Sequence, residues 1–210
     1  MGPLPRLEGR WQLTADDDRE PLVAEYVRVG GVHVQAVMPP RARGGFWHVT
    51  GTPYGTRLIV GDVVGGGFAA GRLSSQILAS WRALAAHEPT IRGVALRLDT
   101  LVAEWGEPER FAPAVLMTVG SEAVCCGHPP PLRYRDGGAL PCPLPPGPPL
   151  GLMAMAGTWA EAGELALQDG EELVLLGHGL DPPERPGLLI EQVTRSRGDA
   201  LGLHVRREPG

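Results

Sequence analysis

Strand-like patterns dominate the chain between residues 22 and 64. Residues 22–29 (LVAEYVRV) and 32–38 (VHVQAVM) are rich in β-branched and apolar positions, as expected of half-buried strands. Gly30 and Gly31 separate the two runs, and a two-glycine connection is typical of a tight β-hairpin. A further apolar run, 57–64 (RLIVGDVV), carries an acid near its end and is followed by three glycines. It predicts a strand that stops at a sharp turn.

The pattern then changes to that of a helix. Leu73, Ile77, Trp81 and Leu84 form one apolar stripe within residues 68–87, which predicts a helix with one buried face.

A second helical pattern follows in residues 90–105, with apolar residues at spacings of three and four. Thr90 is a suitable N-cap and Gly106 a suitable terminator. Because only the short turn 87–89 (HEP) separates the two patterns, we expect an antiparallel pair of helices.

The rest of the chain returns to short strand-like runs, near 113–119, 122–126, 132–135, 164–167, 171–177 and 200–206, with a short helix near 186–196. Strands in consecutive runs, with helices grouped between them, favour an α+β fold with antiparallel sheets over alternating βαβ units. No internal repeat or domain boundary is evident, so residues 1–210 are predicted to form a single domain.

Composition and charge narrow the classes of function. The 210 residues are 43% hydrophobic with a net charge of −5, and no basic stripe suggests nucleic acid or an anionic membrane as a partner. No apolar run reaches the roughly 18 residues of a membrane span, and the first residues lack the apolar stretch of a signal peptide. The three cysteines form neither a disulfide framework nor a zinc motif. These features predict a cytoplasmic protein.

Three local motifs carry no enzymatic signature. Gly65–Gly67 lacks the Lys and Ser/Thr of a P-loop, so it predicts a tight strand-to-helix turn. The Pro-rich stretch 141–149 predicts a stiff extended loop. The acidic run Asp16–Asp18 predicts a solvated turn, because adjacent carboxylates repel one another.

Six segments, in chain order, resemble motifs of the SpoIIE-like branch of the PPM-type metal-dependent protein serine/threonine phosphatases. They are 39–49 (PPRARGGFWHV, against RP…GGDWYDV), 58–70 (LIVGDVVGGGFAA, against lvlGDVsGHGxxAA), 126–137 (CGHPPPLRYRDG, against AGHPPPLLxxxDG), 149–152 (PLGL, against PLGv), 169–180 (DGEELVLLGHGL, against xGDxLLLYTDGL) and 198–207 (GDALGLHVRR, against DDIALLVLRR). The resemblance covers about residues 30–207. It implies a four-layer α/β/β/α sandwich, with two antiparallel sheets face to face and a helix pair on each outer side. Within it, His128 is expected to fix a turn.

The resemblance also implies a two-metal hydrolase. Family members hold two Mn²⁺ or Mg²⁺ ions in a cleft at one end of the sandwich, and a bridging hydroxide attacks phosphoserine or phosphothreonine. Hard divalent cations require several carboxylate oxygens, the more so when two ions lie about 3.5–4 Å apart. By motif, Asp62 is the acid that bridges both metals, and the backbone carbonyl of Val63 is a further ligand.

The other expected acids are replaced. Phe46 stands at the acid of the GGDW motif, His178 at that of TDG, and Gly198 at the first acid of the terminal pair. A phenyl ring cannot coordinate a cation, glycine offers only backbone, and imidazole suits zinc, copper or iron better than Mg²⁺. One of four carboxylates remains, so an ordinary two-metal site is not expected. A transition-metal site of His178, His33 and Asp62 stays open.

The sequence therefore predicts a pseudophosphatase without a cofactor, acting as a regulatory or phosphoprotein-binding module in bacterial signalling. The family commonly dephosphorylates small antagonist proteins in sigma-factor partner switching, so the expected partner is an anti-sigma-factor antagonist or another phosphoprotein. Arg41 and Arg43 are candidates for phosphate binding. The alternative is an active Mn- or Mg-dependent serine/threonine phosphatase acting on a partner-switching regulator. A third hypothesis is dimerisation through the helix pair.

Overall fold

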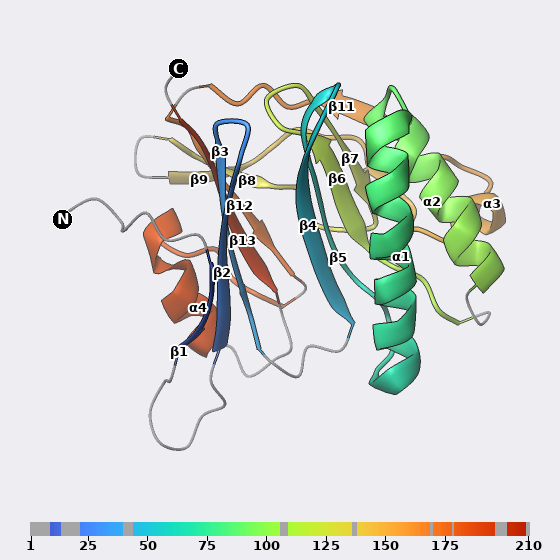
Figure 1. The fold of residues 1–210 in the computed structure, drawn as a ribbon, viewed down its shortest axis with the longest axis horizontal. Coiled ribbons are helices and arrows are strands. Elements are labelled where there is room, and N and C mark those ends of the chain that lie inside the picture. Colours follow the sequence, from blue (N-terminus) through green and yellow to red (C-terminus); the bar gives the residue numbers. More distant parts are fainter. Residues whose placement is uncertain are drawn as a thin grey trace.

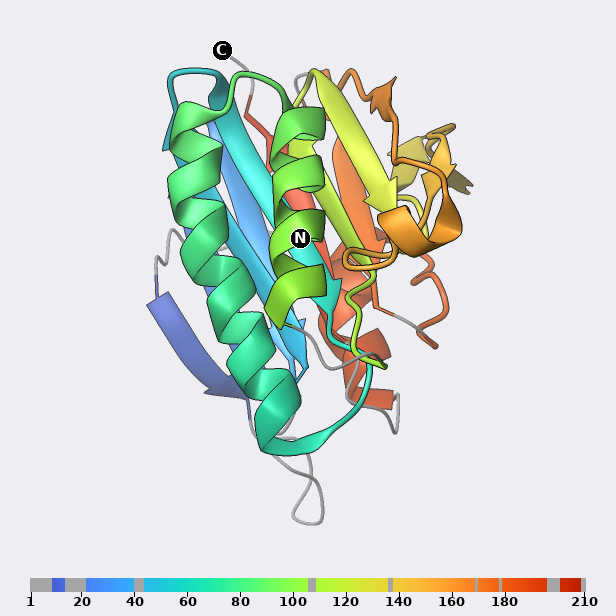
Figure 2. The same ribbon diagram turned by 90° about the vertical axis from the view of Figure 1, so that its right-hand side faces the viewer.

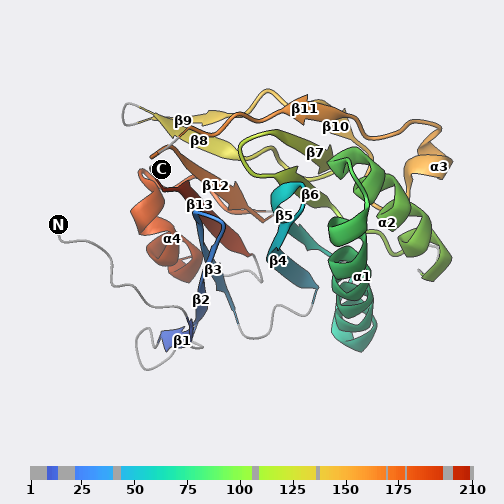
Figure 3. The same cartoon turned by 45° about the horizontal axis from the view of Figure 1, so that its top comes forward.

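Two β-sheets stacked face to face form the centre of the molecule, with helices on both outer sides (Figures 1 and 3). The structure, a computed structural model, describes residues 9–13, 22–39, 44–105, 109–135, 138–168, 170–177, 179–195 and 201–208. The α+β class and the sandwich of two sheets expected from the sequence are confirmed.

The first sheet has seven strands in the order β1-β2-β3-β13-β12-β8-β9. Their bounds are β1 Gly9–Leu13, β2 Leu22–Val29, β3 Val32–Met38, β13 Gly202–Arg207, β12 Glu172–Leu176, β8 Leu132–Arg135 and β9 Gly138–Pro141. All neighbours are antiparallel. The predicted hairpin is β2–β3, and both of its turn glycines have positive φ, a conformation that glycine adopts without strain.

The second sheet has the order β10-β7-β6-β5-β4, with β11 pairing beside β7. The bounds are β10 Pro146–Gly147, β7 Glu122–Cys126, β6 Ala114–Thr118, β5 Gly55–Asp62, β4 Gly45–Thr52 and β11 Ala162–Glu164. β10 lies parallel to β7, and the other pairs are antiparallel. Two expectations need correction here. The strand placed at 164–167 is β11, which ends at Glu164, and the Pro-rich loop contributes the short strand β10.

Helices α1 (Gly67–His87) and α2 (Ile91–Trp105) lie side by side and cover the second sheet (Figure 2). The apolar stripe predicted for α1 is buried against this sheet. The hydroxyl of Thr90 accepts a hydrogen bond from the backbone N–H of Gly93 at 3.0 Å, which confirms the predicted N-cap of α2. The predicted terminator, Gly106, lies outside the described residues.

The outer side of the first sheet differs from the expectation of a second helix pair. Among the described residues it carries one short helix, α4 (Leu189–Arg195), preceded by a 3-10 turn over Pro186–Leu188. Leu189 and Val193 of α4 pack on Val37 and Val174 of the sheet. The short helix α3 (Met153–Ala156) lies on the side of α2 instead (Figure 1). Within the described chain, no helix is both long and apolar enough to cross a membrane.

Candidate functional site

A cavity of about 870 Å³ opens at the end of the sandwich where β5 stops and β4 begins. Its described lining consists of eight glycines, eight apolar residues and two ionisable residues, Asp62 and His128. Gly177 and Leu201 bring the ends of the first sheet to the same cavity. Its position matches the cleft that the sequence resemblance implies, and its lining includes Asp62, which that resemblance aligns with a metal-bridging acid.

Asp62 is the last residue of β5, and its side chain is exposed. A short backbone network fixes the chain here. The N–H of Asp62 donates to the carbonyl of Pro113 at 3.0 Å, and the N–H of Val64 donates to the carbonyl of Phe111 at 2.9 Å. Because these hydrogen bonds hold the backbone on both sides of Val63, the strand end is rigidly placed beside the cavity.

Gly44 allows two potential ligand oxygens to converge. A Cβ atom built on Gly44 would lie 2.5 Å from Oδ1 of Asp62 and 2.7 Å from the carbonyl oxygen of Val63. Real Cβ atoms essentially never approach so closely, so only glycine fits this position. The Gly44 carbonyl accepts hydrogen bonds from the Val63 N–H at 3.0 Å and from the Ser74 hydroxyl at 2.6 Å. The sequence alone does not predict this role, although the adjacent Gly44 and Gly45 mark the position.

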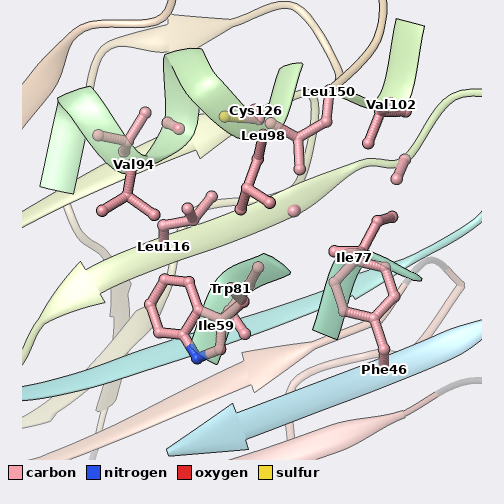
Figure 4. Close-up of a cluster of buried hydrophobic side chains, with 14 of the residues drawn as sticks. Phe46, Ile59, Ile77, Trp81, Val94, Leu98, Val102, Leu116, Cys126 and Leu150 are labelled. Carbon is pink, nitrogen blue, oxygen red and sulfur yellow. The ribbon is translucent and has the colours of Figure 1, made fainter. Parts of the chain in front are cut away.

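Phe46 faces the core instead of the cavity. Its side chain is 2% exposed and belongs to the cluster beneath α1 that includes Ile59 and Ile77 (Figure 4). Its ring also covers Gly61, where an added Cβ would lie 2.6 Å from Cζ of Phe46 and 2.5 Å from the Pro113 carbonyl oxygen. Phe46, which the sequence resemblance aligns with a family acid, is therefore a structural part of the helix-side core.

His128 is a buried residue of the cavity wall, with 8% exposure. Its Nδ1–H donates to the backbone carbonyl of Pro129 at 2.8 Å. This contact ties the ring to the backbone of the next residue, and the turn-fixing role expected from the sequence stays a prediction.

The three glycines after β5 form the predicted strand-to-helix turn. Gly65 and Gly67 have φ values of 92° and 80°, which side chains with a Cβ rarely adopt. All three line the cavity, and α1 begins at Gly67.

The described residues do not fit a two-metal centre. Asp62 is the one residue of the described cavity lining that carries a carboxylate, and two divalent ions close together need several. Over the described parts of the chain, no three His, Cys, Asp or Glu residues are placed to hold an ion.

The remaining predicted site residues divide into two groups. His178, Gly198, Arg41 and Arg43 lie outside the described residues, as does the Asp16–Asp18 run. His33 is described, but it does not join Asp62. Its Nε2 lies 2.6 Å from the carboxylate of Glu208, and it is not a residue of the cavity. The hypothesis of a transition-metal site that includes His33 is therefore wrong.

Comparison with known proteins agrees with this architecture. The family model of stage II sporulation protein E (SpoIIE) matches residues 52–189. No curated protein matches the chain.

Three solved structures share the fold. The RsbU and RsbW domains of Rv1364c from Mycobacterium tuberculosis are 21% identical with a TM-score of 0.65, and the match covers 86% of this chain and 61% of that one. The PP2C phosphatase domain of SpoIIE from Bacillus subtilis, with a fragment of its regulatory domain, is 14% identical with a TM-score of 0.66, covering 88% and 64%. RsbX in complex with magnesium is 13% identical with a TM-score of 0.65, covering 87% and 98%. The chain thus spans less than two thirds of the first two.

Proposed function

This chain belongs to the SpoIIE family of PPM-type phosphatases, and we propose that it is a catalytically impaired member that acts by binding a protein partner. The observation that carries the proposal is the position of Phe46. By the motif resemblance, Phe46 stands where the family has a metal-binding acid. Its phenyl ring is buried beneath α1, and no three described His, Cys, Asp or Glu residues are placed to hold an ion.

Electrostatics supports the loss of the metals. Two divalent ions bring four positive charges into one cleft, and carboxylates must offset most of that charge. Asp62 supplies one negative charge, and by the sequence resemblance Phe46, His178 and Gly198 supply none. Each missing acid also removes a ligand, so the losses compound.

Membership of this family supports a signalling role in which the chain binds another protein. Solved structures with this fold include the PP2C domain of the cell fate determinant SpoIIE and the RsbU domain of Rv1364c. We propose that this chain forms one domain, acts in the cytoplasm, and binds an anti-sigma-factor antagonist or another phosphoprotein regulator without turning it over. In this proposal, His178, Arg41 and Arg43 would contact the partner and would not bind a metal.

One observation favours the alternative of an active phosphatase. The Asp62 carboxylate and the Val63 carbonyl still converge beside Gly44, as a single hard cation would require. Asp62 would then hold Mn²⁺ or Mg²⁺, which would supply Lewis-acid chemistry to a phosphoserine or phosphothreonine substrate.

A calorimetric titration with Mn²⁺, combined with hydrolysis of a chromogenic phosphate ester, separates these two functions. We expect no saturable Mn²⁺ binding in the micromolar range and no turnover above that of Asp62→Asn. Two-site binding with activity that disappears in Asp62→Asn would overturn the proposal in favour of the active enzyme. Circular dichroism of both proteins checks that the variant is folded.

A further inference from the structure

Two apolar side chains lie exposed beside the cavity, on either side of its glycine turn. Val64, just before Gly65–Gly67, is 39% exposed, and Phe68, just after it, is 84% exposed. Phe68 is the most exposed large hydrophobic residue among those that the structure describes. Since Val64 and the three glycines line the cavity, these side chains lie next to its opening.

The fold does not require an aromatic residue at position 68. The buried face of α1 consists of Ala70, Leu73, Ser74, Ile77, Trp81 and Ala85, and Phe68 is not part of it. An exposed phenylalanine does not gain the stabilisation that burial of its ring would give. A single exposed apolar residue is ordinary, but here two of them flank a concave site, as at surfaces that bind partners.

The exposed side of α1 next to this corner is basic, whereas the chain as a whole is acidic and the exposed Asp62 lines the cavity on the other side of the glycine turn. Arg72 lies one helical turn after Phe68, so both residues share a face of α1, and Arg72 is exposed. The 21 residues of α1 include Arg72 and Arg82 but no Asp or Glu, although the chain has a net charge of −5. The guanidinium of Arg110 also lies close, since a Cβ on Gly65 would be 3.1 Å from its Nη1.

We infer that Val64, Phe68 and Arg72, here named the Phe68 surface, dock an acidic segment of a protein partner that carries an apolar residue. This inference rests on the proposed function as a binding module and specifies the chemistry of its partner. Phe68 and Val64 would contact the apolar residue, and Arg72 would attract the flanking carboxylates. The adjoining cavity would bind a neighbouring side chain of the same peptide segment.

A protein segment fits better than a nucleic acid or a membrane. Nucleic acids and anionic membranes are extended polyanions, so they interact with the electrostatic field of the whole molecule. The net charge of −5 repels them. A short peptide contacts only the Phe68 surface, where an exposed arginine lies next to exposed apolar side chains.

Selection of a random peptide library displayed on phage, against the immobilised full chain, tests the inference. We expect enriched peptides to combine Asp or Glu with a large apolar residue. Synthetic copies should bind Phe68→Ser about tenfold or more weakly, the equivalent of about 1.4 kcal/mol. They should bind Arg72→Glu about fivefold more weakly, with the difference shrinking at high salt.

Met155→Ser is the matched control, because Met155 is 78% exposed on α3. It should leave the affinity unchanged. Peptides that bind Phe68→Ser as well as the unaltered chain, or an enriched set without acidic residues, would overturn the Phe68 surface and leave the binding-module function standing. No enrichment, together with Mn²⁺-dependent turnover, would refute the proposed function itself.

Discussion

The indole nitrogen of Trp81 donates a hydrogen bond to Nδ1 of His48 across 3.2 Å, and this pair joins α1 to the edge strand β4. The other ring nitrogen of His48 lies 3.3 Å from Nε of Arg82. Both neighbours are donors, and a neutral imidazole has only one accepting nitrogen. Trp81 is fully buried, so we assign the accepting lone pair to Nδ1.

This geometry makes the stability of the protein depend on pH. Burial first, and then the positive charge of Arg82, lower the pKa of His48 below its ordinary 6.5. The unfolded chain therefore takes up a proton at a higher pH than the folded one. The free energy of unfolding should fall as pH drops from about 6.5 towards the lowered pKa, and level off below it. Urea unfolding at pH 7.5, 6.5 and 5.5 measures this.

His48→Asn is the control, since its amide oxygen can still accept from Trp81 but does not titrate. Its unfolding midpoint should vary less than that of the unaltered chain over the same range. Carboxylates such as Glu172, whose pKa is lowered by the neighbouring His204 (Nε2 to Oε2, 3.4 Å), contribute only at lower pH. An equal loss of stability in both proteins would show that His48 is not the titrating group.

Arg57 should be among the most sensitive positions for stability. This buried side chain, 1% exposed, donates from Nη1 to the carbonyls of Ala85 at 3.0 Å and Glu88 at 2.6 Å, and from Nη2 to that of Pro89. It thereby closes the end of α1 and the turn to α2. Arg57→Met leaves these carbonyls without their donor, so we expect a loss of about 3 kcal/mol in urea unfolding.

The contrasting variant is Arg97→Met on the exposed side of α2. Arg97 forms a surface ion pair with Glu88, and its side chain is 66% exposed. Such pairs contribute little, so the loss should stay below about 1 kcal/mol. Comparable losses in the two variants would argue against the capping role of Arg57.

Local sequence patterns predicted the parts of this fold that depend on interactions between residues close in sequence, such as turns and helix caps. The β2–β3 hairpin follows from Gly30–Gly31, and α2 begins where Thr90 provides a cap. The strand β4 was not predicted, because its sequence GFWHVTGT has two glycines and no regular alternation. It becomes a strand by pairing with all eight residues of β5.

The candidate site was only partly predictable for the same reason. The motif identified Asp62 and showed that Phe46 cannot bind a metal. The cavity wall, however, includes Phe111 and Pro113, whose carbonyls hold the end of β5 from a distant segment. The resemblance also implied a helix pair over the first sheet, but only α4 is described there. Contacts between distant segments leave no local pattern in a single sequence.

Asp99 should control the loop that supports the cavity from the side of α2. Its carboxylate is buried at 2% exposure, and Oδ1 accepts from the N–H groups of Gly151 at 2.6 Å and Met153 at 3.2 Å. The neighbouring Leu150 pairs with Ala112 through two backbone hydrogen bonds of 3.0 Å. Asp99→Ala leaves the buried N–H of Met153 and the part-buried N–H of Gly151 without their acceptor, so we expect about 2–3 kcal/mol of destabilisation.

Hydrogen exchange followed by mass spectrometry gives the local readout. In Asp99→Ala, exchange should accelerate in residues 109–113 and 149–153 more than in the first sheet, for example in 22–39. Asp99→Asn keeps an accepting oxygen and should restore most of the protection. Uniform acceleration across all three segments would mean that the loss is global and that Asp99 does not specifically hold the loop.

Reintroducing the family acid at position 46 should not create a metal site. The Phe46 side chain points into the core beneath α1, where it covers Gly61. Phe46→Asp removes this packing, which costs about 3–5 kcal/mol, and places a carboxyl group in apolar surroundings, which costs more. We expect a largely unfolded protein by circular dichroism, and no Mn²⁺ binding by calorimetry in whatever fraction remains folded. Phe46→Leu keeps an apolar side chain and should lose only about 1 kcal/mol. A stable Phe46→Asp protein that binds Mn²⁺ would instead mean that β4 can turn this side chain towards Asp62, and that the replacement of one residue separates this chain from a metal-binding phosphatase.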